Sequence, residues 1–158
     1  MIKISKLTNK DITKFSKFTK EIVGNNKYYT SFARSEEVKN LDPNKIRRKL
    51  KDKDRIYLIA KNNSNIIGFC YGNFDAGTFW IDYIGISRDF RRSSIASKIL
   101  NYLEIFAKKA NAHKIWCDTR IINKEAISLF KKLGFKKIGV LKKHWYGEDF
   151  IFWEKLIK

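Results

Sequence analysis

Segment 88–97 combines residue types that bind anions. It follows a strand-like run at 78–87, and a helix is predicted to begin within it at about Ser94. The first N–H groups of a helix have no acceptor inside the helix, and the helix dipole adds a partial positive charge there. Two arginines add full charges and small side chains leave the backbone accessible; these residues are Arg91, Arg92, Ser93, Ser94 and Ala96. The pattern predicts a phosphate-binding turn, although an ordinary strand-helix turn with surface arginines would have a similar sequence.

The first fifty residues predict one strand and two helices that would precede this turn. Apolar and polar residues alternate over 2–7, which is typical of a strand with one wet face. A capping sequence at 8–11 precedes apolar residues at helical spacing over 12–22. Asp42 followed by Pro43 predicts the start of the second helix.

The rest of the chain predicts three strands joined by short turns, then helix, strand, helix and a closing hairpin. The strand-like ranges are 56–60, 66–74, 78–87, 114–119, 136–141 and 150–156, and the helices of this part are 95–110 and 123–133. The strand-helix-strand unit from 78 to 119 should be parallel, whereas the hairpins are antiparallel. The order predicts a single α/β domain over residues 1–158, with a mixed, mostly antiparallel central sheet flanked by about four helices.

Charge and composition narrow the class of protein. The net charge is +18, from 34 Lys and Arg against 16 Asp and Glu, and such a field attracts coenzyme phosphates, nucleic acid or acidic substrates. The basic residues are spread along the chain, so a solvated lysine-rich surface is the simpler interpretation and contact with nucleic acid or the ribosome is the alternative. No stretch approaches the ~20 apolar residues of a membrane span, and the first residues lack the apolar run of a secretory signal. We therefore expect a cytoplasmic protein without membrane contact.

The two cysteines, Cys70 and Cys117, lie in apolar strand-like runs, which predicts buried free thiols. No Cys/His spacing in the sequence indicates a zinc site. We therefore expect no bound metal. Free thiols are typical of intracellular proteins, so we also expect an intracellular location.

Two sequence blocks resemble the GNAT N-acetyltransferase superfamily. The family's pyrophosphate-binding motif reads Arg/Gln-x-x-Gly-x-Gly/Ala after a strand, and RRSSIA at 91–96 places Arg91, Ser94 and Ala96 at its fixed positions. The family's second motif, Asn-x-x-Ala followed by Tyr-x-x-Leu-Gly-Phe, resembles NKEAISLFKKLGF at 123–135. A strand separates the two blocks as in the family, and the order of elements matches from end to end. The chain is therefore identified by resemblance as a GNAT acetyltransferase.

The resemblance implies where acetyl-coenzyme A would bind as co-substrate. In this family the strands that correspond to 78–87 and 114–119 splay apart, and the coenzyme enters the gap. Its pantetheine would pair with backbone groups of Ile84, Gly85 and Ile86. The pyrophosphate would be held by Arg91, Arg92, Ser93, Ser94, Ile95, Ala96 and Ser97. Asn123 would also contact the coenzyme, a role compatible with capping the helix that follows it.

Two coenzyme-site positions depart from the family pattern. Ser94 stands where glycine is usual; its Cβ restricts the backbone, although its hydroxyl can donate to a phosphate. Phe130 stands where many members carry a tyrosine that protonates the leaving thiolate. Because a thiol pKa of ~8.5 makes the thiolate only mildly basic, an acid there is not essential, and Tyr146 or water could replace it.

Asp118 and Asp82 are the candidates for the base that takes the proton of the attacking amine. Asp118 lies five residues before Asn123, which matches the general-base glutamate of the bacterial acetyltransferases that act on ribosomal-protein N-termini. Asp82 lies on the preceding strand, where other members carry a catalytic acidic residue. Either aspartate can instead be a strand-end carboxylate paired with a lysine.

The chemistry of amines favours one class of acceptor. An α-amino group with a pKa of ~7.7–8.0 is roughly one tenth neutral at pH 7, whereas a lysine or polyamine amine near ~10.4 is neutral in well under ~0.1% of molecules. A site with an aspartate and no tyrosine acid suits the α-amine, and a strongly cationic protein repels polyamines. The stretch HWYGED at 144–149 resembles the hairpin of protein N-terminal acetyltransferases, whose aromatic residues wall the peptide N-terminus. The hairpin is shorter here, and aromatic residues that simply pack on the sheet are the alternative.

We therefore expect acetyl transfer by direct attack of a primary amine, with a protein or peptide N-terminal α-amine as acceptor. A small-molecule amine, such as an amino sugar, an antibiotic or a polyamine, is the first alternative. A non-catalytic coenzyme A-binding or nucleic-acid-binding module is the second. The sequence leaves a monomer and a homodimer equally open.

Overall fold

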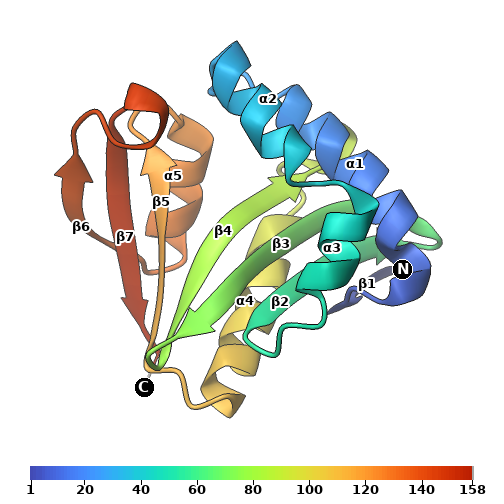
Figure 1. The fold of residues 1–158 in the computed structure, drawn as a ribbon. Helices are drawn as coiled ribbons and strands as arrows, with labels where there is room; N and C mark the ends of the chain where they lie inside the picture. Colours follow the sequence, from blue (N-terminus) through green and yellow to red (C-terminus); the bar gives the residue numbers. More distant parts are fainter. Residues whose placement is uncertain (158) are drawn as a thin grey trace.

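The computed structural model describes residues 1–157, which form one seven-stranded sheet with helices on both faces (Figure 1). The strand order is β1-β2-β3-β4-β5-β7-β6, and every neighbouring pair is antiparallel except β4 and β5. The strands are β1 (Ile2–Lys6), β2 (Arg55–Asn62), β3 (Asn65–Asp75), β4 (Thr78–Ile86), β5 (Lys114–Arg120), β6 (Lys136–Leu141) and β7 (Phe150–Leu156). The mixed sheet, the parallel pair and the closing hairpin predicted from the sequence are confirmed.

Five α-helices lie in the described part of the chain, together with three short 3₁₀ turns. The helices are α1 (Ile12–Gly24), α2 (Ser31–Lys39), α3 (Pro43–Lys49), α4 (Ile95–Lys109) and α5 (Lys124–Lys132), and the 3₁₀ turns are η1 (Asn9–Asp11), η2 (Arg88–Phe90) and η3 (Trp145–Gly147). Helices α1 and α3 pack on one face of the sheet, and α4 and α5 supply side chains to the core on the other face. None of the described helices has the length and apolar composition that crossing a membrane requires.

Helix starts follow the capping signals in some places and not in others. Asp42 caps α3, with its carboxylate accepting from the N–H groups of Asn44 and Lys45, as the Asp-Pro sequence predicted. Thr8 was expected to open α1 directly, but its hydroxyl donates to the Asp11 carboxylate and η1 precedes the helix. Helix α2 was not predicted, because only Ala33 is buried in it and no apolar periodicity marks it.

Two separate apolar cores hold the helices to the sheet. Cys117 and Trp153 lie in the core beneath α4 and α5, whereas Phe15 and Phe69 lie in the core beneath α1 and α3. Cys70 and Cys117 are buried free thiols, as expected from their apolar strands. The two cores fix β4 from both faces, which determines where the side chains of this strand point.

Strands β4 and β5 pair over a short distance and then diverge. The parallel ladder runs from the pair Thr78 and Lys114 to the pair Ile81 and Cys117 and stops there. Figure 1 shows the two strands meeting at one end and separating toward the other, where α2 and the β6–β7 loop lie on opposite sides of the opening. The splayed parallel pair expected from the family resemblance is therefore present.

A β-bulge marks the same point on β4. On β3, Tyr71 pairs with Tyr83 and the next residue, Gly72, pairs with Ile81, so that Asp82 has no partner across the strand. A Cβ at Gly72 would come within 1.9 Å of the Trp80 carbonyl oxygen, so glycine is required here. A bulge changes the direction in which the side chains of a strand point. At this bulge, Asp82 departs from the regular alternation of side chains between the two faces of β4.

Candidate active site

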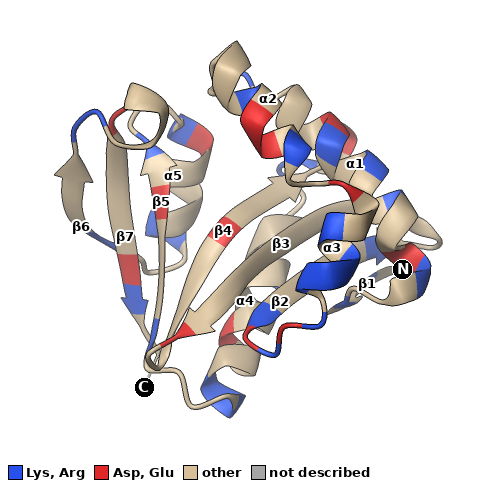
Figure 2. Cartoon of the chain, viewed as in Figure 1, with Lys and Arg blue, Asp and Glu red and all other residues tan. Residues whose placement is uncertain are grey.

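A cleft of about 340 Å³ opens where β4 and β5 diverge. Its walls include the three residues predicted to be catalytic, Asp82, Asp118 and Tyr146. The single acidic positions on β4 and β5 lie next to the opening between the two halves of the sheet (Figure 2). Glu37 of α2 is the third acidic residue of the wall, and we call this hollow the carboxylate cleft. The structure thus brings together three side chains that are up to 64 residues apart in the sequence.

Asp118 is the carboxylate with the most altered pKa in the cleft. Burial raises its pKa to about 6, and the hydrogen bond from Trp145 and the charges of His144 and Arg120 oppose that rise. Trp145 Nε1 donates to one carboxylate oxygen of Asp118 at 2.8 Å. A carboxylate with a pKa near 6 is mostly ionised at pH 7 and still basic enough to take a proton, as a general base requires.

Asp82 lies beside Asp118 but is tied to a cation. Arg55 Nη1 donates to its carboxylate at 2.9 Å, and the two side chains are 26% and 28% exposed. Burial raises the pKa of Asp82, while the charge and hydrogen bond of Arg55 oppose the rise. Proton uptake by Asp82 would weaken this ion pair, so Asp118 is the freer of the two carboxylates.

Tyr146 links the two sides of the carboxylate cleft. Its hydroxyl donates to Glu37 of α2 at 2.8 Å, and its ring contacts the ring of Phe32 edge-on at 5.8 Å. Burial and the neighbouring Glu37 raise the pKa of Tyr146 to about 12. The phenolic proton is therefore held by Glu37 and is harder to release than in a free tyrosine.

The start of α4 presents a row of backbone donors. The N–H groups of residues 92–97 have no hydrogen-bond acceptor within the described residues, and the first bond of the helix is from Lys98 N–H to the Ser94 carbonyl. Arg92 and Ser94 have positive φ angles of 61° and 62°, which turns successive N–H groups toward a common side. Ser93 donates its hydroxyl to the Phe90 carbonyl instead of capping the helix. This donor set fits an anion of the size of a phosphate.

The predicted pantetheine-binding residues lie on the free edge of β4. Ile84, Gly85 and Ile86 pair with β3 on one side, and the described residues provide no strand partner on the side facing β5. Gly85 has a packing reason as well, since a Cβ there would come within 2.6 Å of the Phe69 ring. An extended ligand could therefore meet unpaired backbone groups at this edge.

Asn123 and Phe130 both have structural roles on the α5 side of the opening. The Asn123 side-chain oxygen accepts from Ala126 N–H at 3.1 Å and caps α5. Phe130 is buried and contacts Phe135 at 5.0 Å between ring centroids. Neither residue lines the carboxylate cleft, and a phenylalanine has no proton to supply.

Several cleft residues were not predicted from the sequence. Arg120 is the clearest case, because strand alternation alone places it on the same face of β5 as Asp118. Tyr29, Glu37 and Arg55 come from a loop, an unpredicted helix and a distant strand, and no local pattern marks them. Trp145 was expected to wall the acceptor, but its hydrogen bond to Asp118 was not foreseen.

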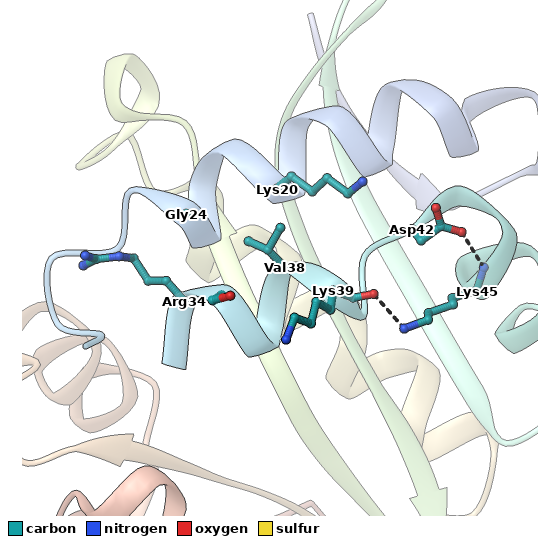
Figure 3. Close-up of a pocket in the computed structure, with 8 residues that line it drawn as sticks. Lys20, Gly24, Arg34, Val38, Lys39, Asp42 and Lys45 are labelled. Carbon is teal, nitrogen blue, oxygen red and sulfur yellow. Dashed lines mark hydrogen bonds between the residues drawn. The ribbon is translucent and has the colours of Figure 1, made fainter. Parts of the chain in front are cut away.

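A second, larger hollow of about 700 Å³ lies between α1, α2 and α3 and shares no lining residue with the carboxylate cleft (Figure 3). Its acidic residue, Asp42, is used in capping α3, and Lys45 donates to the Lys39 carbonyl at 2.9 Å. Among its other cations, Arg34 donates to the Asn26 and Tyr29 carbonyls, Lys39 is exposed and Lys20 is half-buried. This hollow therefore offers no free carboxylate for proton transfer.

Comparisons with known proteins identify the family and agree with the fold. The model of the acetyltransferase (GNAT) family matches residues 25–135, more than half of the chain. A curated N-alpha-acetyltransferase of Sulfurisphaera tokodaii is 26% identical over 115 residues, which cover 63% of this chain and 68% of that protein.

Solved structures share the fold over nearly their whole length. The PaiA N-acetyltransferase of Thermoplasma acidophilum, in complex with coenzyme A, superposes with a TM-score of 0.84 at 21% identity and 99% coverage of both chains. The Escherichia coli ribosomal-protein-S18-alanine N-acetyltransferase gives 0.76 at 18% identity, with 100% of this chain and 95% of that chain covered. An aminoglycoside 6'-acetyltransferase type Ii gives 0.79 at 18% identity, with 99% and 97% covered. At these identities the likeness establishes the fold and leaves the acceptor open. On the family match, this chain is an acetyltransferase that belongs to the GNAT family.

Proposed function

We propose that this acetyltransferase transfers the acetyl group of acetyl-coenzyme A to the N-terminal α-amine of a protein or peptide. The observation that carries the proposal is Asp118, a carboxylate with a pKa of about 6 placed where β4 and β5 diverge. An α-amine needs only a mild base, because about a tenth of it is already neutral at pH 7. The acceptor class is also that of the curated relative named an N-alpha-acetyltransferase.

The start of α4 and the edge of β4 are proposed to bind the coenzyme. The free N–H groups of residues 92–97 would donate to the pyrophosphate, with the exposed Arg91 and Arg92 adding positive charge. Backbone groups of residues 84–86 would pair with the extended pantetheine. Asn123 still has side-chain N–H groups to offer, because its capping bond uses the oxygen. Phe130 would support this region only by packing.

In the proposed mechanism the bound thioester supplies an activated acetyl group, and the protein supplies the base and the walls. Asp118 would take the proton of the amine as it attacks the carbonyl carbon. Trp145 would hold that carboxylate in place through its Nε1–H. Tyr146, with a pKa of about 12 and its proton directed at Glu37, is a weak proton source, so water is favoured as the donor to the thiolate.

A panel of acceptors tests the proposal. Thiol release from acetyl-coenzyme A would be followed with peptides bearing a free N-terminus, the same peptides acetylated at the N-terminus but containing lysine, and small amines. We expect the highest kcat/KM for free N-termini. Equal or higher kcat/KM for the blocked lysine peptides or for a small amine would overturn the proposed acceptor, and no thiol release with any amine would overturn catalysis itself.

A small-molecule amine is the second candidate acceptor, supported by the likeness in fold to the aminoglycoside 6'-acetyltransferase. The cleft volume of about 340 Å³ would admit a small amine as well as the end of a peptide. Contact with nucleic acid has less support, because lysine and arginine occur on helices at both ends of the sheet (Figure 2). The acceptor panel distinguishes the first two candidates directly.

A further inference from the structure

Arg120 is a buried cation whose hydrogen-bonding capacity is unused. It is the last residue of β5, is only 3% exposed and lines the carboxylate cleft. Its Nε and Nη2 atoms are shielded from solvent and have no hydrogen-bond partner within residues 1–157. A buried charged group without hydrogen-bond partners lowers the stability of the folded protein. A bound ligand that accepts hydrogen bonds from Arg120 would offset this loss.

The residues around Arg120 stabilise its charge without filling its donors. The guanidinium carbon lies 3.8 Å from the ring centroid of Tyr29 and 5.1 Å from that of Phe150. These cation–π contacts place the positive charge beside two aromatic rings, which stabilises it. Neither residue accepts a hydrogen bond from the buried Nε or Nη2, so these donors are left for another group.

The acidic residues of the cleft are already engaged with other donors. Asp118 accepts from Trp145, Asp82 from Arg55 and Glu37 from Tyr146. None of these three carboxylates accepts from the buried Nε or Nη2 of Arg120 in the described part of the chain. A carboxylate brought by the acceptor would supply the missing hydrogen-bond acceptor.

We propose that Arg120 binds a carboxylate of the acceptor while Asp118 faces its amine. This inference rests on the proposed function and defines its substrate class: peptides with an acidic side chain next to the N-terminal residue. Asp118 and Arg120 lie on one face of β5, two residues or about 7 Å apart along the strand. That separation suits the side chain of a second residue and exceeds the reach of a free amino acid, whose carboxylate is one carbon from its amine.

Two matched peptides test the proposal on the unmodified protein. One begins Ser-Glu and the other Ser-Gln, with the same following sequence, and free serine is the third acceptor. Because a hydrogen-bonded charge pair is gained with glutamate alone, we expect kcat/KM for the Ser-Glu peptide to exceed that for Ser-Gln by about tenfold or more. Free serine should be the poorest acceptor.

Single-residue variants test whether Arg120 is the cause of the preference for Ser-Glu over Ser-Gln. Arg120→Met keeps most of the side-chain volume and should remove the preference for Ser-Glu, whereas Arg120→Lys should keep part of it. Lys49→Met is the control, because Lys49 is another cation of the same cleft and its loss should leave the preference intact.

Three outcomes would overturn the assignment of Arg120. They are equal kcat/KM for the two peptides, free serine as the best acceptor, and an Arg120→Met variant that loses activity equally toward both peptides. The first two need no variant, so they decide the matter even if Arg120→Met fails to fold. Absence of thiol release with every acceptor would instead refute the proposed function.

Discussion

The start of α4 and the carboxylate cleft are built from different parts of the polypeptide. At the start of α4, the free donors are backbone N–H groups of one continuous segment, 92–97. In the cleft, the polar groups are side chains from four strands, two helices and loops: β2, β3, β4, β5, α2, α3, the loops on either side of α2 and the β6–β7 loop. A backbone donor set needs only the right local conformation, whereas a side-chain site needs the whole fold to assemble. A short motif can therefore mark the first kind of site and cannot mark the second.

Asp118→Asn should give the largest difference between the two regions, because it alters the carboxylate cleft and leaves the start of α4 unchanged. The amide keeps the shape and can still accept from Trp145, but it cannot take a proton, so kcat/KM toward a free N-terminus should fall by about 10²–10⁴-fold. Affinity for acetyl-coenzyme A should stay unchanged, because the donors of α4 are not altered. Thiol release and calorimetric titration measure the two effects, and Asp82→Asn is the matched variant with the smaller expected loss. Unchanged turnover in Asp118→Asn would show that Asp118 is not the base.

Asp118→Asn should lower activity but raise the stability of the folded protein. Asp118 has a pKa of about 6 in the folded protein against ~3.9 unfolded, so the folded state binds more protons between these values. This favourable contribution is complete below about pH 4 and is lost as pH rises through 6. At pH 7, Asp118→Asn should therefore raise the free energy of unfolding by about 1–3 kcal/mol, and the gain should disappear at pH 4. Denaturant unfolding at the two pH values measures this, and a gain that is the same at both would contradict the raised pKa.

Trp145→Phe tests whether the cleft depends on a single hydrogen bond. Loss of the Nε1–H donor removes a contact that lowers the pKa of Asp118, so that pKa should rise above 6. We expect kcat/KM to fall about three- to tenfold at pH 6 and to recover at pH 8, where the carboxylate is ionised in both proteins. The pH profile of kcat/KM measures the shift. A uniform loss at all pH values would assign Trp145 to binding the acceptor instead.

Ser94→Gly should have the smallest effect and concerns the backbone-built region. Ser94 has a φ of 62°, a conformation that favours glycine, so the substitution should stabilise the protein by up to about 1 kcal/mol. Ser93→Gly is the control, because Ser93 does not have a positive φ and loses its bond to the Phe90 carbonyl, and it should destabilise. Thermal unfolding of the two variants should give changes of opposite sign. Destabilisation by Ser94→Gly would show that its side chain has a role that the backbone angle does not explain.

The sequence predicted the sheet far better than the cleft, for a physical reason. Strands such as 78–86 and helices such as 95–109 are determined by local apolar periodicity, which the sequence displays directly. Helix α2 was missed because it buries only Ala33, yet it supplies Glu37 to the cleft. The β-bulge at Asp82 was also missed, since it depends on pairing with β3. Asp118 was predicted from the family resemblance, through its spacing from Asn123, but its raised pKa results from burial that only the folded chain provides.

The short β4–β5 ladder has a consequence for how the molecule opens. Strand pairing in the described chain joins the β1–β4 half to the β5–β7 half through four residue pairs, whereas β2 and β3 share eight. Parting of the two halves would break few backbone hydrogen bonds, so amides of β5 near Cys117 should exchange with deuterium before those at the centre of β2 and β3. Coenzyme bound across the opening would bridge the halves and should slow that exchange, which makes exchange at β5 a measure of occupancy independent of turnover.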